Sequence, residues 1–217
     1  VIPYWRDRSD SGAFENTDPD PFTQFVFDFG TDTHSWGGSA QLQVDRPIAG
    51  FQNRVILGSE SLRADVTHTS APVSTFCTRA CTGDTEVHRG IWSGFAQEEF
   101  SLLENLLVSA GLRYHTADYQ GSSVNTDPFS TTVQTLSRTP TALSPRAGLT
   151  WRFLPTSSAY VSYSRGFRFP NFDESIGFAG DLFDLQPQRS NAYEIGFKQR
   201  SETVSANLAF YWMVVKD

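Results

Sequence analysis

The residues of this chain whose types could support chemistry are two cysteines, some carboxylate pairs and a set of arginines. Cys77 and Cys81 stand with three residues between them in a polar stretch, and the chain has 2 cysteines in total. Such a pair could be half of a metal site, a redox pair or a disulfide. His68 and His88 lie well outside tight ligand spacing for a metal. We therefore interpret Cys77 and Cys81 as a loop disulfide formed in an oxidising compartment and predict no metal site.

The carboxylates do not form a catalytic arrangement. Glu98 and Glu99 are adjacent, and adjacent side chains of a strand point to opposite faces, so this pair cannot converge on one substrate. The run Asn16-Thr-Asp-Pro-Asp20 lacks the spacing and the glycine of a calcium-binding loop. Because the chain also lacks a Gly-rich phosphate loop, a nucleophile elbow and a metalloprotease motif, we predict no enzyme, no cofactor and no catalytic residue.

Composition narrows the class of protein further. The formal net charge of −7 argues against a nucleic-acid partner, because no basic stripe is present to meet phosphates. Aromatic residues make up 14% of the chain and glycines number 16, which suits strands and turns better than a helical bundle. No apolar run approaches the roughly 18 to 20 residues of a membrane helix.

Two adjacent segments alternate with the period of a strand. In residues 144–153 and 158–169 every second side chain is apolar, and the short interval around Pro155 predicts a tight antiparallel hairpin. The same alternation returns over 193–198 and 204–214. Parity predicts one lipid-facing set and one lumen-facing set. The first contains Leu149, Trp151, Val161, Leu208 and Phe210, and the second contains Thr150, Ser162 and Asn207.

The same alternation assigns faces to the cationic and aromatic residues of these strands. Arg113, Arg146, Arg152 and Lys198 are interpreted as lining the lumen or contacting a plug within it, with attraction of a substrate as the alternative. Tyr114, Trp151, Phe167, Phe169 and Trp212 are interpreted as an interfacial aromatic girdle. Arg165 shares parity with the apolar face, so it either lies above the lipid band or marks a bulge.

The rest of the chain predicts an all-β architecture with connections of two lengths. Further strands are expected over 23–29, 39–45, about 52–66, 89–101 and 105–115. Residues 1–21, 67–88, 120–141 and 170–190 are expected to be loops, and short turns are expected near positions 48, 103, 155 and 201. Short turns on one side and long loops on the other are typical of outer-membrane β-barrels.

Three motifs add a family resemblance. They are Ser144-Pro-Arg-Ala-Gly-Leu149, Tyr163-Ser-Arg-Gly-Phe-Arg-Phe-Pro170 and Leu185-Gln-Pro-Gln-Arg-Ser-Asn-Ala-Tyr-Glu-Ile-Gly-Phe-Lys198. In this order and spacing they resemble the barrel of TonB-dependent outer-membrane receptors. The resemblance implies an antiparallel transmembrane β-barrel, of which residues 1–217 form a part: about 8 to 10 strands of a barrel of roughly 22. We expect the plug domain, the TonB-contacting segment and the closing strands to lie outside this chain.

The resemblance also implies a function and a location. It suggests active import of a ferric siderophore through the outer membrane of a Gram-negative bacterium, with energy relayed by the TonB complex. A receptor for cobalamin, haem or another scarce nutrient, and a passive porin-like barrel, are the alternatives. The expected partners are a metal chelate, the TonB complex and outer-membrane lipid.

Ligand capture is expected in the long loops, because binding residues collect in loops carried by a rigid wall. Cationic and aromatic side chains suit a ferric catecholate or hydroxamate, whose iron needs no direct ligand from the protein. The candidate ligand-binding residues are Arg79, Phe129, Phe172, Phe178, Phe183 and Arg189.

Overall fold

The computed structural model describes residues 2–16, 25–48, 50–74, 81–127, 129–170 and 186–216. These residues form one antiparallel sheet of 10 strands. The strands are β1 (Ile2–Asn16), β2 (Phe25–Asp45), β3 (Asn53–Ser74), β4 (Thr82–Leu103), β5 (Leu106–Thr126), β6 (Thr131–Arg138), β7 (Thr141–Leu154), β8 (Ser157–Arg168), β9 (Gln188–Arg200) and β10 (Ser205–Lys216). Among the described residues there is no helix long and apolar enough to cross a membrane.

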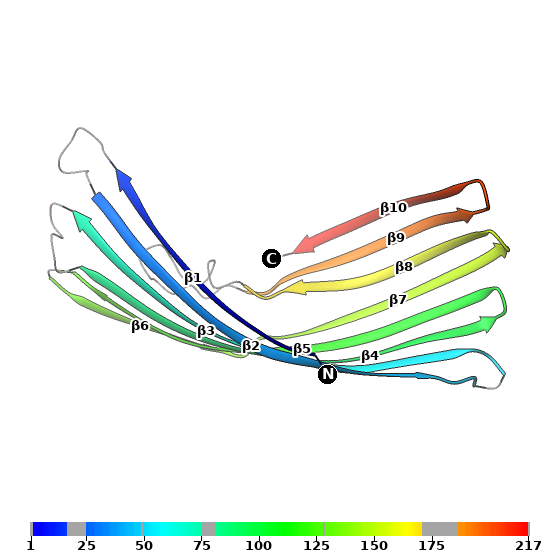
Figure 1. Cartoon of the computed structure of the whole chain (residues 1–217), viewed down its shortest axis with the longest axis horizontal. Helices are drawn as coiled ribbons and strands as arrows, with labels where there is room; N and C mark the ends of the chain where they lie inside the picture. The colour runs from blue at the N-terminus through cyan, green and yellow to red at the C-terminus, as the bar shows by residue number, and fades with distance from the viewer. Residues whose placement is uncertain are drawn as a thin grey trace.

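The strands follow one another across the sheet almost in sequence order, β1-β2-β3-β4-β5-β7-β8-β9-β10, with β6 paired to β5. The sheet is strongly curved, with the short turns at one end and the long connections at the other (Figure 1). This is the wall of a partial antiparallel barrel, as the sequence predicts.

The predicted short turns are confirmed. Ile48 and Phe51 exchange backbone hydrogen bonds of 2.9 and 3.0 Å across the β2–β3 turn, and the Ser201 N–H donates to the Val204 carbonyl at 2.8 Å between β9 and β10. The other two turns join β4 to β5 and β7 to β8. We call this end of the sheet the short-turn end and the opposite one the long-connection end.

Several predicted loops are wrong, because the ladders continue beyond the segments that show apolar alternation. Residues 2–16 form β1 and pair with β2, β3 continues to residue 74, β4 begins at residue 82, and 120–141 contains the end of β5 and all of β6. Backbone hydrogen bonds hold a ladder whatever the side chains are. Above the lipid band both faces of a strand can carry polar residues, so the sequence shows no alternation of polarity that would reveal the strand.

β6 and β7 lie on one line along β5. Tyr119 pairs with Arg138 of β6, and Thr116 pairs with Thr141 of β7, in one unbroken register. Between the two strands stands Pro140, whose nitrogen carries no hydrogen to donate to a ladder. The Ala117 N–H donates to the Pro140 carbonyl at 3.0 Å and so bridges the interruption.

The register divides the side chains between two faces. We call the face that carries the cross-strand row Val108, Leu149, Val161, Ile195 and Phe210 the outer face, and the opposite one the inner face. All five residues predicted to face lipid share the outer face, and Thr150, Ser162 and Asn207 lie on the inner face. The predicted division into two faces is therefore confirmed, and the contact of the outer face with lipid stays a prediction. Glu98 and Glu99 point to opposite faces, as predicted.

Aromatic rings gather at two levels of the outer face. Towards the long-connection end, Tyr163 lies 5.2 Å from Tyr193, which lies 6.2 Å from Trp212, between ring centroids. Towards the short-turn end, the Phe153 ring lies 5.5 Å from Trp151 and 6.0 Å from Phe197. Amphipathic rings at two levels, with apolar side chains between them, are typical of the two interfaces of a membrane.

The buried residues lie mainly on the inner face of β3, β4 and β5, towards the long-connection end. They include Ala64, Val66, Val87, Ala117 and Tyr119, with the polar residues His68, Thr85 and Ser123 among them. Phe169 joins this core rather than the aromatic girdle predicted for it, and Phe167 packs against it. The girdle prediction is therefore wrong for these two residues. Phe169 lies beyond the end of β8, and the Phe167 ring lies 4.3 Å from that of His115 on the inner face, where β8 has separated from β7.

Candidate functional site

A buried tyrosine between two arginines is the centre of the candidate site. Arg89, Tyr119 and Arg138 are cross-strand partners on β4, β5 and β6, and they share the inner face. The Arg138 guanidinium carbon lies 5.0 Å from the Tyr119 ring centroid and that of Arg89 lies 6.0 Å from it. Tyr119 is 1% exposed. Guanidinium groups at these distances interact with the face of the ring and fix its position.

The chain that leaves β8 folds across this row. The Tyr119 hydroxyl donates to the Pro170 carbonyl at 3.1 Å, and Arg89 Nη1 donates to the same oxygen at 3.5 Å. The Phe169 ring packs edge-on to Tyr119, with 6.5 Å between centroids. We call Arg89, Tyr119, Arg138, Phe169 and Pro170 the Tyr119 cluster. Its contacts bring the start of the β8–β9 connection onto the inner face of β4 and β5.

A second charged group lies on the same face, closer to the short-turn end. Arg113 forms an ion pair with Glu60, donates to the Ser93 hydroxyl at 2.7 Å and lies 5.3 Å above the Phe95 ring. The Phe95 ring occupies the space over Gly58, where a Cβ would meet it at 2.2 Å. Arg113 therefore lines the inner face, as predicted, with its charge compensated across the wall.

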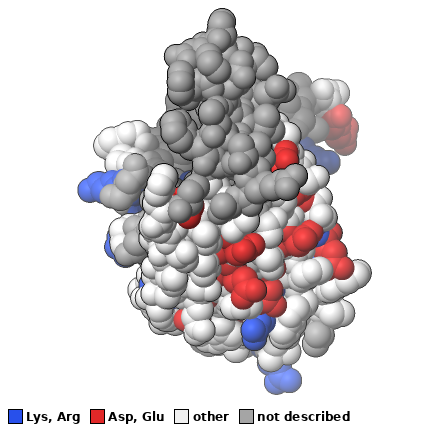
Figure 2. All heavy atoms as spheres, turned by 90° about the vertical axis from the view of Figure 1, so that its left-hand side faces the viewer, with Lys and Arg blue, Asp and Glu red and all other residues white. Residues whose placement is uncertain are grey.

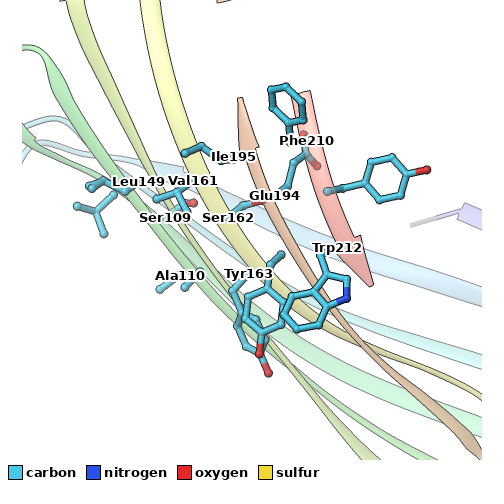
Figure 3. Close-up of a pocket in the computed structure, with 15 residues that line it drawn as sticks. Ser109, Ala110, Leu149, Val161, Ser162, Tyr163, Glu194, Ile195, Phe210 and Trp212 are labelled. Atoms are coloured by element: carbon cyan, nitrogen blue, oxygen red, sulfur yellow. The ribbon is translucent and has the colours of Figure 1, made fainter. Parts of the chain in front are cut away.

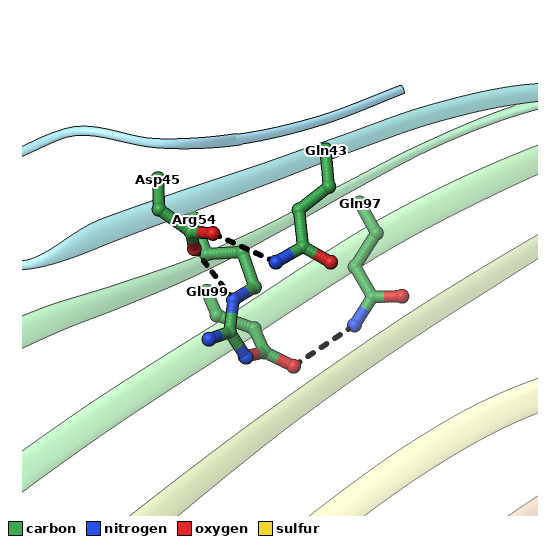
Figure 4. Close-up of polar contacts among 5 residues, drawn as sticks. All are labelled: Gln43, Asp45, Arg54, Gln97 and Glu99. Carbon is green, nitrogen blue, oxygen red and sulfur yellow. Dashed lines mark hydrogen bonds and ion pairs between the residues drawn. The ribbon is translucent and has the colours of Figure 1, made fainter. Parts of the chain in front are cut away.

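The inner face also carries a network near the short turns (Figure 4). Arg54 Nε donates to Asp45 at 2.7 Å, and Gln43 donates to the same carboxylate at 2.7 Å. On the other side, the Arg54 guanidinium lies 3.5 Å from Glu99, which accepts from Gln97 at 3.2 Å. This network holds β2, β3 and β4 together with side chains whose hydrogen bonds run along the inner face.

The outer face is hollowed across β5, β7, β8, β9 and β10 (Figure 3). The groove has a volume of about 600 Å³, and its lining is mostly apolar. Ala110 and Ala147 lie between the larger side chains of Leu149 and Val161 on one side and Tyr163 on the other. Its depth therefore comes from two small residues that share a cross-strand row with the large side chains of Tyr163, Tyr193 and Trp212.

Acidic side chains gather at the long-connection end of the molecule, with basic ones at the periphery (Figure 2). On the outer face of β1 to β5, beyond the aromatic rows, the register places Asp7, Asp28, Asp32, Asp65, Asp84, Glu86 and Asp118. Two of these carboxylates contact histidines: His34 Nδ1 lies 2.7 Å from Asp7 Oδ1, and His88 Nδ1 lies 2.7 Å from Asp65 Oδ1. Within the described ranges, no group of His, Cys, Asp and Glu side chains is arranged to hold a metal ion.

The predicted ligand-binding residues are only partly described. Phe129 is 91% exposed at the turn between β5 and β6. Arg189 is exposed near the start of β9, where the register places it opposite Lys216 on the outer face. The two lie on separate elements. Arg79, Phe172, Phe178 and Phe183 lie outside the described residues. A ligand-binding role for all six stays a prediction.

The cysteine prediction has a similar outcome. Cys81, directly before β4, is 6% exposed and disulfide-bonded. Cys77 lies outside the described residues, so the bond between the two stays a prediction.

Sequence reasoning missed the Tyr119 cluster. Arg138 fell within a predicted loop, 120–141, and Arg89 at the end of a strand with mixed faces. The useful signal was the hairpin: a tight turn after residue 103 pairs Arg89 with Tyr119 if the ladder continues outward. Extending each predicted ladder beyond its apolar segment would have placed the three side chains in one row.

Comparison with known proteins assigns the family. A family model described as TonB dependent receptor-like, beta-barrel, matches residues 3–217. The chain belongs to this family.

Solved structures of two uptake receptors and a transporter share the fold at low sequence identity. The ferric yersiniabactin uptake receptor FyuA from Yersinia pestis is 12% identical with a TM-score of 0.66, over 99% of this chain and 37% of FyuA. The ferric-catecholate import receptor Fiu from E. coli K12 is 12% identical with a TM-score of 0.65, over 98% of this chain and 37% of Fiu. The copper transporter OprC is 12% identical with a TM-score of 0.66, over 96% of this chain and 35% of OprC. The chain thus spans little more than a third of the length of each of these three proteins.

Proposed function

We propose that the protein to which this barrel wall belongs imports a ferric siderophore through the outer membrane of a Gram-negative bacterium, with energy relayed by the TonB complex. The observation that carries the proposal is the Tyr119 cluster, in a chain of the TonB-dependent receptor family. It holds two half-buried guanidinium groups on the inner face, towards the long-connection end, around the buried rings of Tyr119 and Phe169. We infer no catalytic role, because a transport receptor needs binding residues and a route rather than a reacting group.

The chemistry of the cluster suits an anionic chelate whose metal is already saturated with ligands. Such a chelate offers negative oxygens at its surface and, in catecholates, flat aromatic rings. Guanidinium groups bind the first through charge-assisted hydrogen bonds and stack on the second. A chelate that entered from the long-connection end would meet Arg89 and Arg138 before it met Arg113 and Glu60. We therefore propose the Tyr119 cluster as an early contact on the inward route.

We further propose that a plug domain, contributed by a part of the protein outside this chain, contacts the inner face near the short turns. The Arg54 network offers carboxylate, guanidinium and amide groups there at fixed positions. Such groups can exchange partners with a domain that moves during transport, because each is exposed enough to rehydrate.

The test uses the full-length receptor in a deletion strain under iron limitation, with single iron chelates supplied as the only iron source. We expect the wild-type gene to restore growth on at least one anionic ferric chelate, and purified receptor to bind that chelate. Replacing Arg89 and Arg138 together by alanine should weaken binding at least about tenfold, since loss of each charge-assisted hydrogen bond costs about 1.5–3 kcal/mol. Replacing both by lysine should restore part of it.

The matched control is Arg63→Ala, which removes an arginine from the neighbouring strand β3 but on the outer face. It should leave chelate binding unchanged. If deletion of the gene affects no iron source but abolishes cobalamin uptake, the siderophore assignment is wrong and the receptor assignment survives. If the double alanine variant folds and binds the chelate like the wild type, the Tyr119 cluster is not a contact site.

A further inference from the structure

Three cations gather on the outer face just beyond the upper aromatic row, where β8, β9 and β10 run towards the long-connection end. Arg189 pairs directly with Lys216, and Arg165 lies one step nearer to the ring of Tyr163. All three side chains are exposed. No ion pair among the described residues involves any of them.

This arrangement costs stability unless an anion compensates it. Like charges directly opposite each other on neighbouring strands destabilise a sheet by up to about 1 kcal/mol. Several other arginines of the described wall lie against carboxylates, as Arg54 with Asp45 and Arg113 with Glu60 show. An unpaired row of cations on this sector is therefore an exception that points to a partner outside the sheet.

A cavity lies directly beside these cations. The β7–β8 ladder ends at the pair Arg146–Ser164, next to Pro145, which has no N–H to donate to a ladder. Beyond that point, residues 141–143 and 165–167 line a cavity of about 190 Å³ together with Tyr114 and Arg189. Two guanidinium groups thus share the lining of a notch with a tyrosine and a leucine.

The outer-face groove lies below this notch on the same strands. Its lining includes Tyr163, Tyr193 and Trp212, the residues of the upper aromatic row, and continues over Val161 and Ile195 towards the short turns. A ligand with an anionic head in the notch could thus lay an acyl chain along the groove. The opposite sector of the wall, β1 to β5, carries carboxylates on this face and would repel the same ligand.

We propose that Arg165, Arg189 and Lys216, with the notch and the groove beneath them, bind a phosphate-bearing lipid of the outer leaflet. The inference rests on the membrane placement in the proposed function but not on its substrate. The aromatic row places the cations at the height of lipid headgroups, and arginine matches phosphate through paired hydrogen bonds. The phosphate meets the guanidinium groups, and an acyl chain fills the groove over Ala110 and Ala147. Bound lipid also removes the repulsion between Arg189 and Lys216.

The test is lipid binding by the full-length receptor in mild detergent, followed by native mass spectrometry. The probes are diphosphoryl lipid A, monophosphoryl lipid A and sodium pyrophosphate. We expect the receptor to bind the diphosphoryl lipid most tightly, the monophosphoryl lipid less tightly and pyrophosphate weakly. Neutralising all three cations (Arg165→Gln, Arg189→Gln, Lys216→Gln) should weaken diphosphoryl lipid binding on the order of 100-fold, since each cation near an anionic surface contributes a factor of about five.

The matched control removes the same number of charges near the short turns: Arg152→Gln, Lys198→Gln and Arg200→Gln. This control variant should retain lipid binding, and a variant with lysine at 165 and 189 should retain most of it. Heat-modifiable migration on a gel establishes that each variant is folded. Equal lipid binding by the neutralised variant and the wild type would overturn the inference. Pyrophosphate binding as tight as lipid binding would overturn it too, because it would show a site for small anions.

The inference and the proposed function fail separately. A receptor that imports no siderophore but loses lipid binding in the neutralised variant still supports the lipid site. Chelate uptake is measured on the same cells, so that the two results can be compared directly.

Discussion

An arginine introduced on the outer face of β7 should destabilise the folded barrel according to its depth in the membrane. Leu149 lies on this face opposite Val108 and Val161 and is 40% exposed. The lower aromatic level on this strand is at Trp151 and Phe153, and the upper one is reached at Ala147, which pairs with Tyr163. A rise of about 3.3 Å per residue separates Phe153 from Ala147 by about 20 Å along the strand.

Strand tilt reduces that separation to about 15 Å along the membrane normal. Leu149 lies between the two levels, and Ala147 lies at the upper one. An arginine at the midplane costs about 2–4 kcal/mol, and one near the interface about 0–1 kcal/mol. We therefore expect about 0–1 kcal/mol for Ala147→Arg and about 2–4 kcal/mol for Leu149→Arg. Thr150→Arg, on the inner face, should cost much less.

The measurement is reversible folding of the full-length receptor into lipid vesicles, followed by tryptophan fluorescence across a denaturant series. The difference in free energy of unfolding between each variant and the wild type gives the cost directly. If Thr150→Arg destabilises as much as Leu149→Arg, the assignment of faces is wrong. If Ala147→Arg costs as much as Leu149→Arg, the assignment of faces stands, but the placement of the upper aromatic level at Ala147 is wrong.

Three further predictions address the loops and the edges. Cys77 and Cys81 should both resist alkylation in protein taken from the outer membrane without reductant, as mass spectrometry would show; two alkylated thiols would contradict the disulfide. In the β5–β6 turn, hydrogen bonds from the Ser130 hydroxyl and from the Phe129 and Ser130 amides hold the pKa of Asp127 below its ordinary value. The ionised carboxylate therefore stabilises the turn above the ordinary pKa, and this contribution is lost as the pH falls through the lowered one; unchanged amide shifts across that window would refute it. The isolated 217-residue chain should aggregate, because the described β1 and β10 each pair on one side only; a monodisperse, heat-modifiable barrel in detergent would contradict this.

Strand identity and facing could be read from the sequence wherever lipid constrains the wall. Leu149 and Val161 must be apolar because lipid offers no hydrogen bonds. Every second residue of such a strand is therefore apolar, and this alternation is visible in the sequence. The short turns were equally readable, because a tight turn needs few residues and leaves little choice of register. The alternation of apolar and polar residues along β5 also predicted the face of Arg113 correctly.

Above the lipid band the sequence carried less information. Asp7 and Arg8 lie on opposite faces of β1, yet both meet water, so no alternation of polarity marks the strand. Arg138 joins Tyr119 only through a ladder whose polar side chains resemble those of a loop. The Tyr119 cluster also depends on where the chain turns after Arg168, which no local pattern specifies, because the turn is set by packing of Phe169 on a distant strand.

The interruption at Pro140 has a consequence for how the wall comes apart. β5 pairs with β7 through one ladder and with β6 through another. Between the two ladders, two hydrogen bonds connect the described residues: one from the Ala117 N–H to the Pro140 carbonyl, and one of 3.3 Å from the Thr139 hydroxyl to Asp118. Cooperative opening spreads along uninterrupted ladders and weakens where they stop. The amides of the β5–β6 ladder should therefore exchange with solvent deuterium as a separate unit, ahead of those of the β5–β7 ladder. The part of the wall that holds the Tyr119 cluster can thus loosen and re-form while the part within the lipid stays closed.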